Sequence, residues 1–317
     1  MEKEEKKKVS VLVPCFNEIE NIKCFAEELL QLFQEKLNQY DYEIVFIDNC
    51  STDGTKEVLE GLCRNSFRIK AIFNARNFGW SNSTFHGLRQ MNGDCAILMC
   101  ADFQDPIELL PQFLSEWEKG YQIVAGIKRQ SAENFFLWSM RSLYYKFIRK
   151  VSSVDQIEHF FGFGLYDKTF LSVLRQLDDS APFLRGIVAE LGSRRKDVYY
   201  VQPRRRFGKS HFNLYNLYDF AMQGFTSYTK AGLRLATFVG FLFSAVTMLI
   251  ALFYFVSKIL WWDAFQVGIA PVVIGMFFLG SIQLFFLGLL GEYILSINAR
   301  VMHRPLVVEE KRINFDN

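Results

Sequence analysis

The sequence lacks the residue patterns that mark zinc sites, dinucleotide sites and phosphate-binding loops. Its six cysteines all lie in the first third of the chain and form no CxxC pair, and only four histidines accompany them. A zinc site is therefore not expected, and unpaired thiols suit a reducing cytosol. Neither GxGxxG nor GxxxxGKS/T occurs, which argues against a Rossmann dinucleotide site and a P-loop.

The chain also lacks a strong net charge and an apolar leader. The formal net charge is only +2, so no bulk attraction to nucleic acid is expected. The first residues, MEKEEKKK, mix both signs of charge and contain no apolar core. We expect residues 1–8 to form a solvated tail rather than a signal peptide.

Charge is missing altogether from two long stretches near the C-terminus. The run from Leu235 to Val256 contains no charged residue over 22 positions, and Ala264 to Gly291 forms a second uncharged run. Each is about as long as a helix that crosses a bilayer, and the intervening SKILWWD has paired tryptophans that suit a membrane interface. We expect a hairpin of transmembrane helices over 232–258 and 264–297. The alternative is a pair of buried helices in a soluble core.

Basic residues predict the orientation of this hairpin. The connecting loop holds only Lys258, which Asp263 balances, whereas the outer flanks carry Lys230, Arg234, Arg300, Arg304, Lys311 and Arg312. By the positive-inside bias, the N-terminal domain and both termini lie in the cytoplasm. We therefore expect a protein of the cytoplasmic (inner) membrane with two spans and a cytoplasmic tail over 298–317.

Two further stretches mix aromatic residues with scattered charges at roughly helical spacing. They cover residues 134–150 and 211–230, the second within a juxtamembrane segment expected over 201–231. Amphipathic helices of this kind can lie in the plane of a membrane interface. The alternative is core packing with a basic outer face.

Residues 8–130 alternate short β-branched runs with amphipathic helical patterns, and the predicted domain extends over 9–200. The expected strands cover 9–14, 43–48, 68–73, 95–99 and 122–127, and the expected helices lie around 20–38, 55–64, 81–91 and 106–119. This alternation predicts an α/β domain with a mostly parallel, doubly wound sheet covered on both faces. Ligands of such sheets bind outside the carboxyl ends of the strands.

Polar residues gather where the expected strands end. The first four strands are followed by PCFNE, DNCSTDGT, NARNFGWS and CADFQDP. Four such clusters on one rim are hard to attribute to turn chemistry alone. In the last cluster, Asp102, Gln104 and Asp105 indicate a metal or phosphate site. Asp105-Pro106 is equally a good start for the next helix.

At this point the sequence resembles a known family. VLVPCFNEIENI, IDNCSTDGT, ARNFGWS and ADFQDPIELLP resemble, in order and spacing, the nucleotide-sugar domain (GT-A type) of the family-two inverting glycosyltransferases. RRFGKSHFN, the two apolar runs and LGLLGEYILSINARVMHRPLVV resemble the polyprenyl-phosphate glycosyltransferases among them. These are relatives of dolichyl-phosphate mannose synthase and of the bacterial bactoprenol glucosyltransferases. The resemblance covers nearly the whole chain.

The resemblance implies donor-binding roles for the residues at the rim. Asp48 is the best candidate for pairing with a uracil or guanine edge. Asp53 is left open, because it can equally cap the helix at Thr55. An Asn-x-Gly turn is the alternative for Asn77. The implied donor residues are Pro14, Asn17, Glu18, Asp48, Asn49, Arg76, Asn77 and Asp102.

In the family, the fourth strand delivers a D-x-D pair that binds a divalent cation beside the sugar diphosphate. Cys100 replaces the first acid here, which leaves Asp102 and Gln104 as the metal ligands. Mg²⁺ and Mn²⁺ prefer hard oxygen ligands, so a thiol is a poor substitute, although diphosphate oxygens and water can complete the shell. We expect Mg²⁺ or Mn²⁺ as cofactor, and Asp102, Asp105 and Arg205 as catalytic residues.

A second departure concerns a proposed base. Gly162 and Gly164 stand where many relatives carry the Asp and Arg of an Asp-Phe-Arg-Leu stretch. A lipid phosphate, with a second pKa near about 6, is already deprotonated at pH 7 and needs positioning and charge neutralisation instead. The candidate residues for the acceptor phosphate are Lys128, Arg129, Arg141, Arg205 and Ser210. The alternative for Arg204 to Arg206 is a patch attracted to anionic lipid head groups.

We expect a membrane-anchored transferase that moves one sugar from a nucleotide-diphosphate sugar, with a UDP-sugar favoured, to polyprenyl (undecaprenyl) phosphate for surface-glycan modification. A flippase and further copies of the chain are candidate partners, whereas nucleic acid is not. A processive polysaccharide synthase would need more spans and a Gln-x-x-Arg-Trp motif, which is absent. Two alternatives stay open. One is a catalytically inactive scaffold, which Cys100 and Gly162 suggest, and the other is a transferase with a soluble acceptor.

Overall fold

The strands and helices expected for the first part of the chain are present. The computed structural model describes residues 6–130, 148, 152, 154, 157–208, 214–229, 231–260, 269–302 and 304–315. Its first elements are β1 (Lys8–Cys15), α1 (Ile19–Glu35), β2 (Asp41–Asp48), α2 (Thr55–Asn65), β3 (Ile69–Asn74), α3 (Trp80–Gln90), β4 (Cys95–Leu98), η1 (Ile107–Leu109), α4 (Leu110–Glu118) and β5 (Ile123–Gln130). The predicted boundaries differ from these by a few residues.

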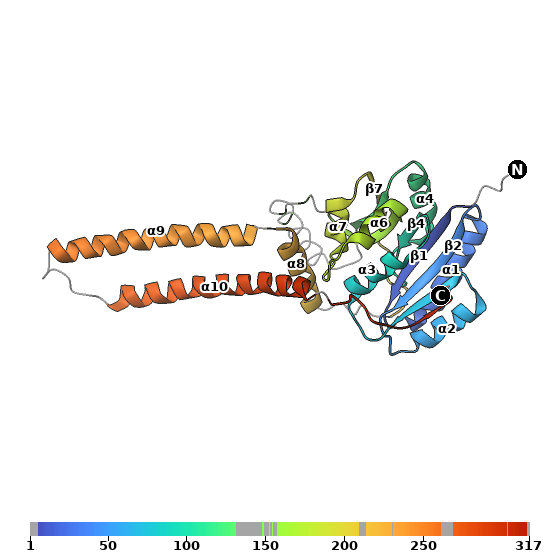
Figure 1. Cartoon of the computed structure of the whole chain (residues 1–317), viewed down its shortest axis with the longest axis horizontal. Helices are drawn as coiled ribbons and strands as arrows, with labels where there is room; N and C mark the ends of the chain where they lie inside the picture. The colour runs from blue at the N-terminus through green and yellow to red at the C-terminus, as the bar shows by residue number, and fades with distance from the viewer. Residues whose placement is uncertain are drawn as a thin grey trace.

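The later elements complete the domain and add a helical hairpin (Figure 1). They are β6 (Phe160–Asp167), α6 (Lys168–Gln176), α7 (Leu184–Leu191), β7 (Arg195–Val201), α8 (Leu214–Tyr228), α9 (Ala231–Leu260), α10 (Ile269–Val301) and β8 (Glu309–Ile313).

The strands form one eight-stranded sheet in the order β7-β5-β6-β4-β1-β2-β3-β8. β4, β1, β2 and β3 are parallel neighbours, as expected. β5 does not lie beside β4, because β6 is inserted between them and is antiparallel to both. β5 therefore runs in the direction of β4, and β7 is parallel to β5. The sheet is mostly parallel, and all strands except β6 and β8 end at the same edge.

Glycines explain why β6 escapes detection in the sequence. Glycine weakens a strand pattern and often marks a close backbone approach. A Cβ at Gly164 would lie 2.5 Å from the carbonyl oxygen of Val124 on β5, so the pairing of these two strands requires glycine at this position.

Helices cover both faces of the sheet and produce two apolar cores. On one face, α1, α2 and α4 bury side chains such as Phe25, Leu59 and Phe113. On the other, α3, α6 and α7 bury side chains such as Phe85 and Leu171. In α1 the buried positions recur at helical spacing, at Ile22, Phe25, Ala26, Leu29, Leu32 and Phe33. The expected doubly wound α/β fold is confirmed.

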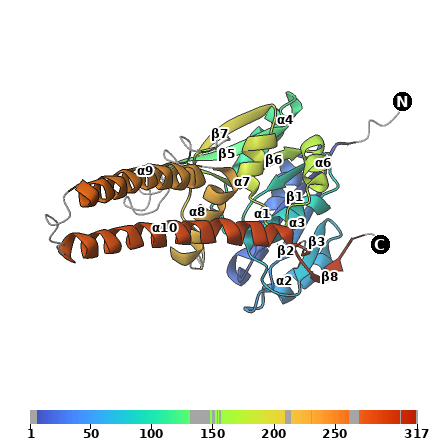
Figure 2. The same cartoon turned by 60° about the vertical axis from the view of Figure 1, so that its left-hand side comes forward.

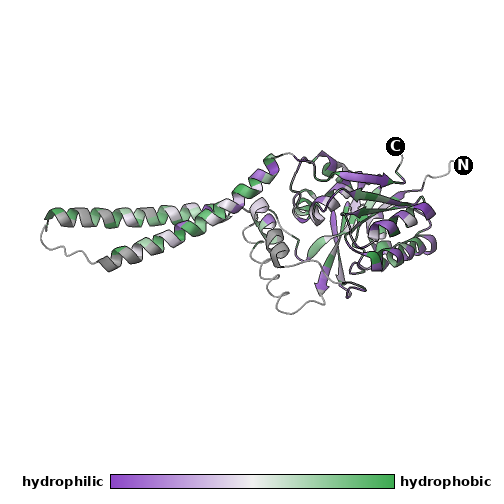
Figure 3. Cartoon of the chain, turned by 90° about the horizontal axis from the view of Figure 1, so that it is seen from below, coloured by the Kyte–Doolittle hydropathy of each residue, from purple (hydrophilic) through white to green (hydrophobic). Residues whose placement is uncertain are grey.

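The helices α9 and α10 extend away from this domain side by side (Figures 1 and 3). Their most apolar stretches, Ala231–Ile250 and Phe278–Val301, have mean hydropathies of 1.9 and 1.7. None of the first stretch and only 6% of the second is buried within the protein. Both helices are long and apolar enough to cross a membrane.

The helix α8 lies between the hairpin and the domain (Figure 1). It is held to both: Gln223 Nε2 donates to the carbonyl oxygen of Ala181 at 3.1 Å, and Ser227 Oγ accepts from Arg300 of α10 at 2.8 Å. Its position in a membrane interface stays a prediction. The other amphipathic stretch, 134–150, lies almost wholly outside the described residues.

The end of the chain is not a free tail. After α10, residues 309–313 form β8, which pairs antiparallel with β3 and becomes an edge of the sheet. Figure 2 shows this strand beside β3 and α2. No strand was predicted here, because EEKRI has no apolar face.

Candidate active site

The polar clusters after β1 and β2 are bonded to each other at the carboxyl edge of the sheet. Asn17, with φ 55°, donates its backbone N–H to Ser51 Oγ at 2.8 Å, and its side-chain oxygen accepts from Thr52 N at 2.8 Å. The N–H of Asn49 donates to the carbonyl oxygen of Cys15 at 3.0 Å. The two loops therefore form one surface, as their position at adjacent strand ends predicted.

Asn49 also fixes the loop after β3. Its Oδ1 accepts from Asn74 Nδ2 and from Phe78 N, each at 3.0 Å, and its Nδ2 donates to Asn77 Oδ1 at 2.8 Å. Asn77 Oδ1 in turn accepts from Gly79 N at 2.9 Å. Arg76 is exposed, with its guanidinium 4.4 Å from the ring centroid of Phe78. The expected donor residues Asn49, Arg76 and Asn77 thus lie together.

Asp48 lies beneath this surface. Asp48 is 1% exposed, and its carboxylate accepts from the backbone N–H of Ser51 at 3.1 Å and from the Ser51 hydroxyl. Burial raises the pKa of Asp48, and the Ser51 hydrogen bonds partly offset this. Pro14 is also buried, in β1. Ser51 was missed in the sequence, where a serine in a turn carries no signal of its own.

Asp53 caps two helices. Its carboxylate accepts from Thr55 N at 3.0 Å and Thr55 Oγ1 at 2.6 Å, at the start of α2. It also accepts from Ile19 N at 3.1 Å, at the start of α1. Burial raises its pKa, but these hydrogen bonds outweigh burial and hold the pKa below the usual value. The capping interpretation of Asp53 is the one that the structure supports.

The loop after β4 leaves Asp102 and Gln104 partly exposed and buries the residue between them. Phe103, with φ 61°, is 8% exposed and packs edge-on against Phe25, 5.2 Å between ring centroids. Asp102 and Gln104 are both partly exposed, and the Asp102 carboxylate accepts from Gln104 N at 3.1 Å. Two residues with oxygen-bearing side chains in this loop are therefore open to solvent.

Asp105 is buried and holds this loop in place by hydrogen bonds. It is 5% exposed, and its carboxylate accepts from Cys100 N at 3.0 Å and from the Tyr200 hydroxyl at 3.1 Å. Burial raises the pKa of Asp105, while nearby Lys128 acts in the opposite direction. Asp105 does not cap the following helix, which the Asp-Pro sequence had left open. Tyr200, on β7, could not be linked to it from the sequence.

The residues at this edge fit a divalent cation with few protein ligands. Within the ranges described above, no three His, Cys, Asp or Glu side chains form a metal-binding group. Asp102 and Gln104 offer two hard oxygen ligands. Mg²⁺ and Mn²⁺ are often bound by one or two protein oxygens together with phosphate and water.

Arg205 lies between two of the expected site residues. A guanidinium nitrogen of Arg205 donates to Glu18 Oε1, and Nη1 lies 3.9 Å from Asp102 Oδ2. All three side chains are largely buried, with exposed fractions of 16% for Arg205, 12% for Glu18 and 14% for Asp102. Burial raises the pKa of Glu18, and the hydrogen bonds from Asn21 and Arg205 partly offset this.

Asn21 completes the contact between α1 and the segment that leads to the hairpin. It is 1% exposed, and its Nδ2 donates to Glu18 Oε2 at 2.7 Å and to the carbonyl oxygen of Phe207 at 3.3 Å. Arg205 Nε donates to the same carbonyl at 2.9 Å. Asn21 was not predicted, because an asparagine on the first turn of a helix has no distinct signal.

The other candidate cations occupy different environments. Arg206 is exposed, pairs with Glu28 and covers the ring of Phe103, 3.8 Å from its centroid; Arg204 is exposed. Lys128 lies near Asp105, with its Nζ 4.4 Å from the ring centroid of Phe161, and Arg129 stacks on Tyr199. Both residues are at the carboxyl end of β5. Arg141 and Ser210 lie outside the described residues.

Cys100 carries a thiol rather than a thiolate. Burial raises its pKa well above the usual value, and the negative charges of Asp105 and Asp102 act in the same direction. A protonated thiol is a poor ligand for Mg²⁺ or Mn²⁺. The position of the first acid of the D-x-D pair therefore supplies no hard oxygen ligand in this chain.

We expect Cys100→Asp to lower the Mn²⁺ concentration that gives half-maximal sugar transfer, several-fold, because a hard carboxylate then adjoins Asp102. The measurement is transfer against Mn²⁺ concentration. Cys24→Asp, at an exposed position of α1, adds the same charge elsewhere and serves as the control. Transfer that is indifferent to chelator in both the wild type and Cys100→Asp would show that no metal takes part.

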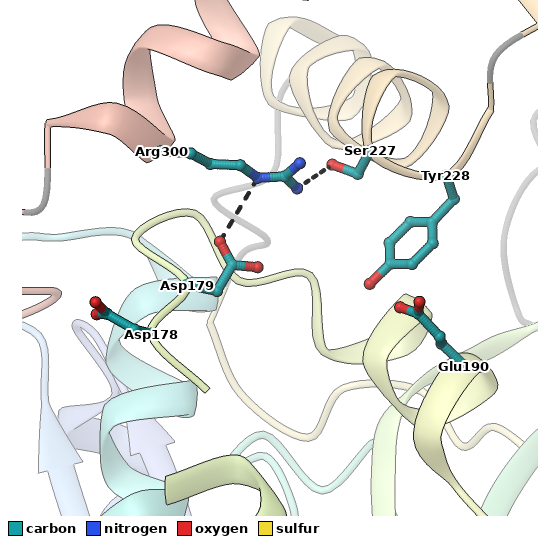
Figure 4. Close-up of a pocket in the computed structure, with 6 residues that line it drawn as sticks. All are labelled: Asp178, Asp179, Glu190, Ser227, Tyr228 and Arg300. Atoms are coloured by element: carbon teal, nitrogen blue, oxygen red, sulfur yellow. Dashed lines mark hydrogen bonds and ion pairs between the residues drawn. The ribbon is translucent and has the colours of Figure 1, made fainter. Parts of the chain in front are cut away.

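A separate polar cavity of about 320 Å³ lies where the domain meets the hairpin (Figure 4). It is lined by Asp178, Asp179, Glu190, Ser227, Tyr228 and Arg300. Arg300 Nε lies 3.6 Å from Asp179 Oδ1, and Arg300 also bonds to Ser227 of α8. These contacts fasten the end of α10 to the domain. The lining includes none of the expected site residues.

The chain is similar to known glycosyltransferases over nearly its whole length. The family model described as "Glycosyl transferase family 2" matches residues 10–192. The SfII prophage-derived bactoprenol glucosyl transferase of Shigella flexneri is 31% identical over 314 residues, which cover 96% of this chain and 98% of that protein. The prophage bactoprenol glucosyl transferase homolog of Escherichia coli (strain K12) is 30% identical over 308 residues, which cover 94% and 97%.

One similar solved structure is the glucosyl-3-phosphoglycerate synthase from Mycobacterium tuberculosis in complex with Mn²⁺, UDP-glucose and phosphoglyceric acid. The match has a TM-score of 0.47 and 17% sequence identity. The match covers 69% of this chain and 78% of that one. The family model spans more than half of the chain, and it includes the four clusters that form the edge described above. The chain therefore belongs to glycosyl transferase family 2 and is a glycosyltransferase.

Proposed function

We propose that the protein transfers a single sugar from a UDP-sugar to polyprenyl phosphate, with inversion of the anomeric centre. The observation that carries this proposal is the position of Arg205. Its guanidinium contacts Glu18 and Asp102 at the donor edge, and its segment leads directly into α8 and the apolar hairpin. A nucleotide sugar and a lipid phosphate would therefore meet at this residue. The relatives named bactoprenol glucosyl transferases support the same acceptor class.

The donor would lie across the loops after β1, β2 and β3. Asn17, Asn49 and Asn77 are held there by mutual hydrogen bonds, which makes the surface rigid before a ligand binds. Arg76 is exposed beside it and is available to a phosphate or the base. Asp48 is buried, so we propose that it sets the position of Ser51 as well as facing the nucleobase.

Asp102 and Gln104 would hold a divalent cation, Mg²⁺ or Mn²⁺, against the diphosphate. When bound, the cation neutralises the charge that develops on the leaving nucleotide. Arg205 would turn from Asp102 towards the acceptor phosphate while it keeps its bond to Glu18. Lys128 and Arg129 would add positive charge from the end of β5.

The reaction needs no protein base. An anionic oxygen of the lipid phosphate attacks the anomeric carbon, a new C–O bond forms on the face opposite the nucleotide, and UDP departs with the electron pair of the broken bond. Gly162 has φ 99°, and a Cβ there would lie 3.2 Å from atoms of Leu98 and Trp80. An acidic side chain at this position would be strained, which agrees with a nucleophile that is already deprotonated.

We further propose that α9 and α10 cross the cytoplasmic membrane with the domain and both termini on the cytoplasmic side. The basic residues at the outer ends of the hairpin support this orientation. The lipid-linked sugar would be made on that side and moved across by a separate flippase.

Incubation of the purified full-length protein with undecaprenyl phosphate and a panel of nucleotide sugars tests the proposal. We expect release of the nucleotide and a lipid-linked sugar of opposite anomeric configuration, with a UDP-sugar as the best donor. Failure to bind any nucleotide sugar would support an inactive scaffold. Transfer to a soluble acceptor by a protein truncated near residue 200 would contradict the lipid acceptor.

A further inference from the structure

We propose that β8, the strand after the apolar hairpin, positions the donor-binding loop 75–79, so that affinity for the donor depends on the chain beyond α10. This inference rests on the proposed donor site. It assigns a role to residues that lie beyond the range matched by the family model, which ends at residue 192.

The backbone of β8 and of the residue before it is hydrogen-bonded to the start of this loop. Asn74, the last residue of β3, is paired with Glu309, and Ala75 N donates to the carbonyl oxygen of Val308 at 2.9 Å. Asn74 Nδ2 in turn donates to Asn49 Oδ1 at 3.0 Å and to Ser83 Oγ of α3 at 3.1 Å. Asn49 is the residue that holds Asn77 and Phe78. One hydrogen-bonded network thus runs from β8 to the donor edge.

The side chains of β8 fasten it to the helices on either side. Towards α3, Glu309 pairs with His86 and with Arg312, and Arg312 Nη2 donates to Gln90 Oε1 at 2.9 Å. The α3 helix begins at Trp80, immediately after the loop. β8 therefore contacts both elements that flank the loop with Arg76 and Asn77: it pairs with β3 before the loop and bonds to α3 after it.

Towards α2, Lys311 pairs with Glu60, and Glu310 pairs with Lys56 at 2.6 Å. These contacts have no comparable effect on the donor loop, because Asp53 already fixes the start of α2. The charged side chains of β8 thus contact two helices, and only α3 adjoins the loop.

The start of β8 is also tied to the hairpin. Arg300, near the end of α10, bonds to Ser227 and faces Asp179 (Figure 4). Its carbonyl oxygen accepts from Ser180 Oγ at 3.0 Å. Eight residues separate Arg300 from Glu309. The second apolar helix and the donor loop are therefore connected through a short, anchored segment.

Two charge-neutral double variants of the full-length protein test this role. Glu309→Ala with Arg312→Ala removes the contacts to α3, and Glu310→Ala with Lys311→Ala removes those to α2. With UDP as the probe in calorimetry, we expect the first variant to raise Kd about tenfold, within the range by which packed networks modulate a site. The second should stay within about twofold of the wild type. The KM for undecaprenyl phosphate should change little in either variant.

A purely structural role would lower Tm in both variants and leave the Kd for UDP unchanged, and that result would overturn the inference. If the first variant does not fold, Glu309→Gln serves instead, because it keeps a hydrogen bond to His86 and loses only the charge. It should show a smaller rise in Kd, and a wild-type value would count against the proposal. A wild-type protein that binds no UDP would overturn the proposed donor itself, which is a distinguishable outcome.

Discussion

Replacement of Asp102 by alanine is expected to reduce sugar transfer about a hundredfold to a thousandfold while the protein stays folded. Asp102 is one of only two oxygen ligands proposed for the cation, and it lies 3.9 Å from Arg205. Loss of a single group that stabilises developing charge costs roughly a hundredfold to a thousandfold in rate. The measurement is transfer from a UDP-sugar to undecaprenyl phosphate at saturating Mn²⁺.

The fold should tolerate this change, because the Asp102 carboxylate accepts only the local hydrogen bond from Gln104 N among the hydrogen bonds described, and its ion pair with Arg205 is long, at 3.9 Å. Glu108→Ala is a matched control, since it removes an exposed carboxylate from the same loop region without touching the site. Wild-type turnover in Asp102→Ala would overturn the assignment. A loss of equal size in Glu108→Ala would point to a general effect on the loop.

The central part of the fold was predictable because its signal is local. β1 to β4 are short apolar runs, and the polar clusters at their ends follow from the direction of the strands. The same logic placed Lys128 and Arg129 at the correct edge even though β5 is not next to β4, because β6 reverses direction between them.

The remaining elements depend on contacts between distant residues. β8 consists of EEKRI, and its charged side chains find partners on α2 and α3 more than 200 residues earlier in the chain. A strand of this composition, at the edge of a sheet, has no apolar alternation to reveal it. β6 was hidden by glycines that the close approach of β5 requires.

In the candidate site, too, the residues were predictable from local sequence, whereas their contacts were not. An aspartate at position 53 suits both a helix cap and a donor ligand, so the sequence cannot separate the two roles. The hydrogen bonds from Thr55 and Ile19 identify the cap. Glu18 and Arg205 were both expected at the site, but as ligands of different substrates. Their contact, 187 residues apart in the chain, makes Glu18 a partner of Arg205 as well.

Replacement of Arg205 by alanine is expected to lower kcat/KM for the lipid phosphate about tenfold to a hundredfold, with the Kd for UDP nearly unchanged. A charge-assisted hydrogen bond of this kind contributes roughly 1.5–3 kcal/mol, which corresponds to that range. Arg205→Lys should recover only part of the loss, because lysine lacks the planar fork. Transfer is measured in detergent at fixed donor concentration while the lipid phosphate is varied.

The neighbouring arginines provide matched controls, because the three side chains differ in their surroundings. Arg204 is exposed and Arg206 pairs with Glu28 over the ring of Phe103, whereas Arg205 is turned inward. We expect Arg204→Ala and Arg206→Ala to have mild effects on transfer. Equal effects at all three positions, each reversed by added anionic lipid, would instead show that the run only anchors the protein.

A double variant separates the chemical role of Arg205 from its structural one. Arg205→Ala leaves the largely buried carboxylate of Glu18 without its cationic partner, which lowers stability in addition to any effect on catalysis. Adding Glu18→Gln removes that unpaired charge, while the amide oxygen still accepts from Asn21. If Arg205 binds the acceptor phosphate, the double variant should regain Tm and remain deficient in kcat/KM. Recovery of both quantities together would mean that Arg205 acts only by neutralising Glu18.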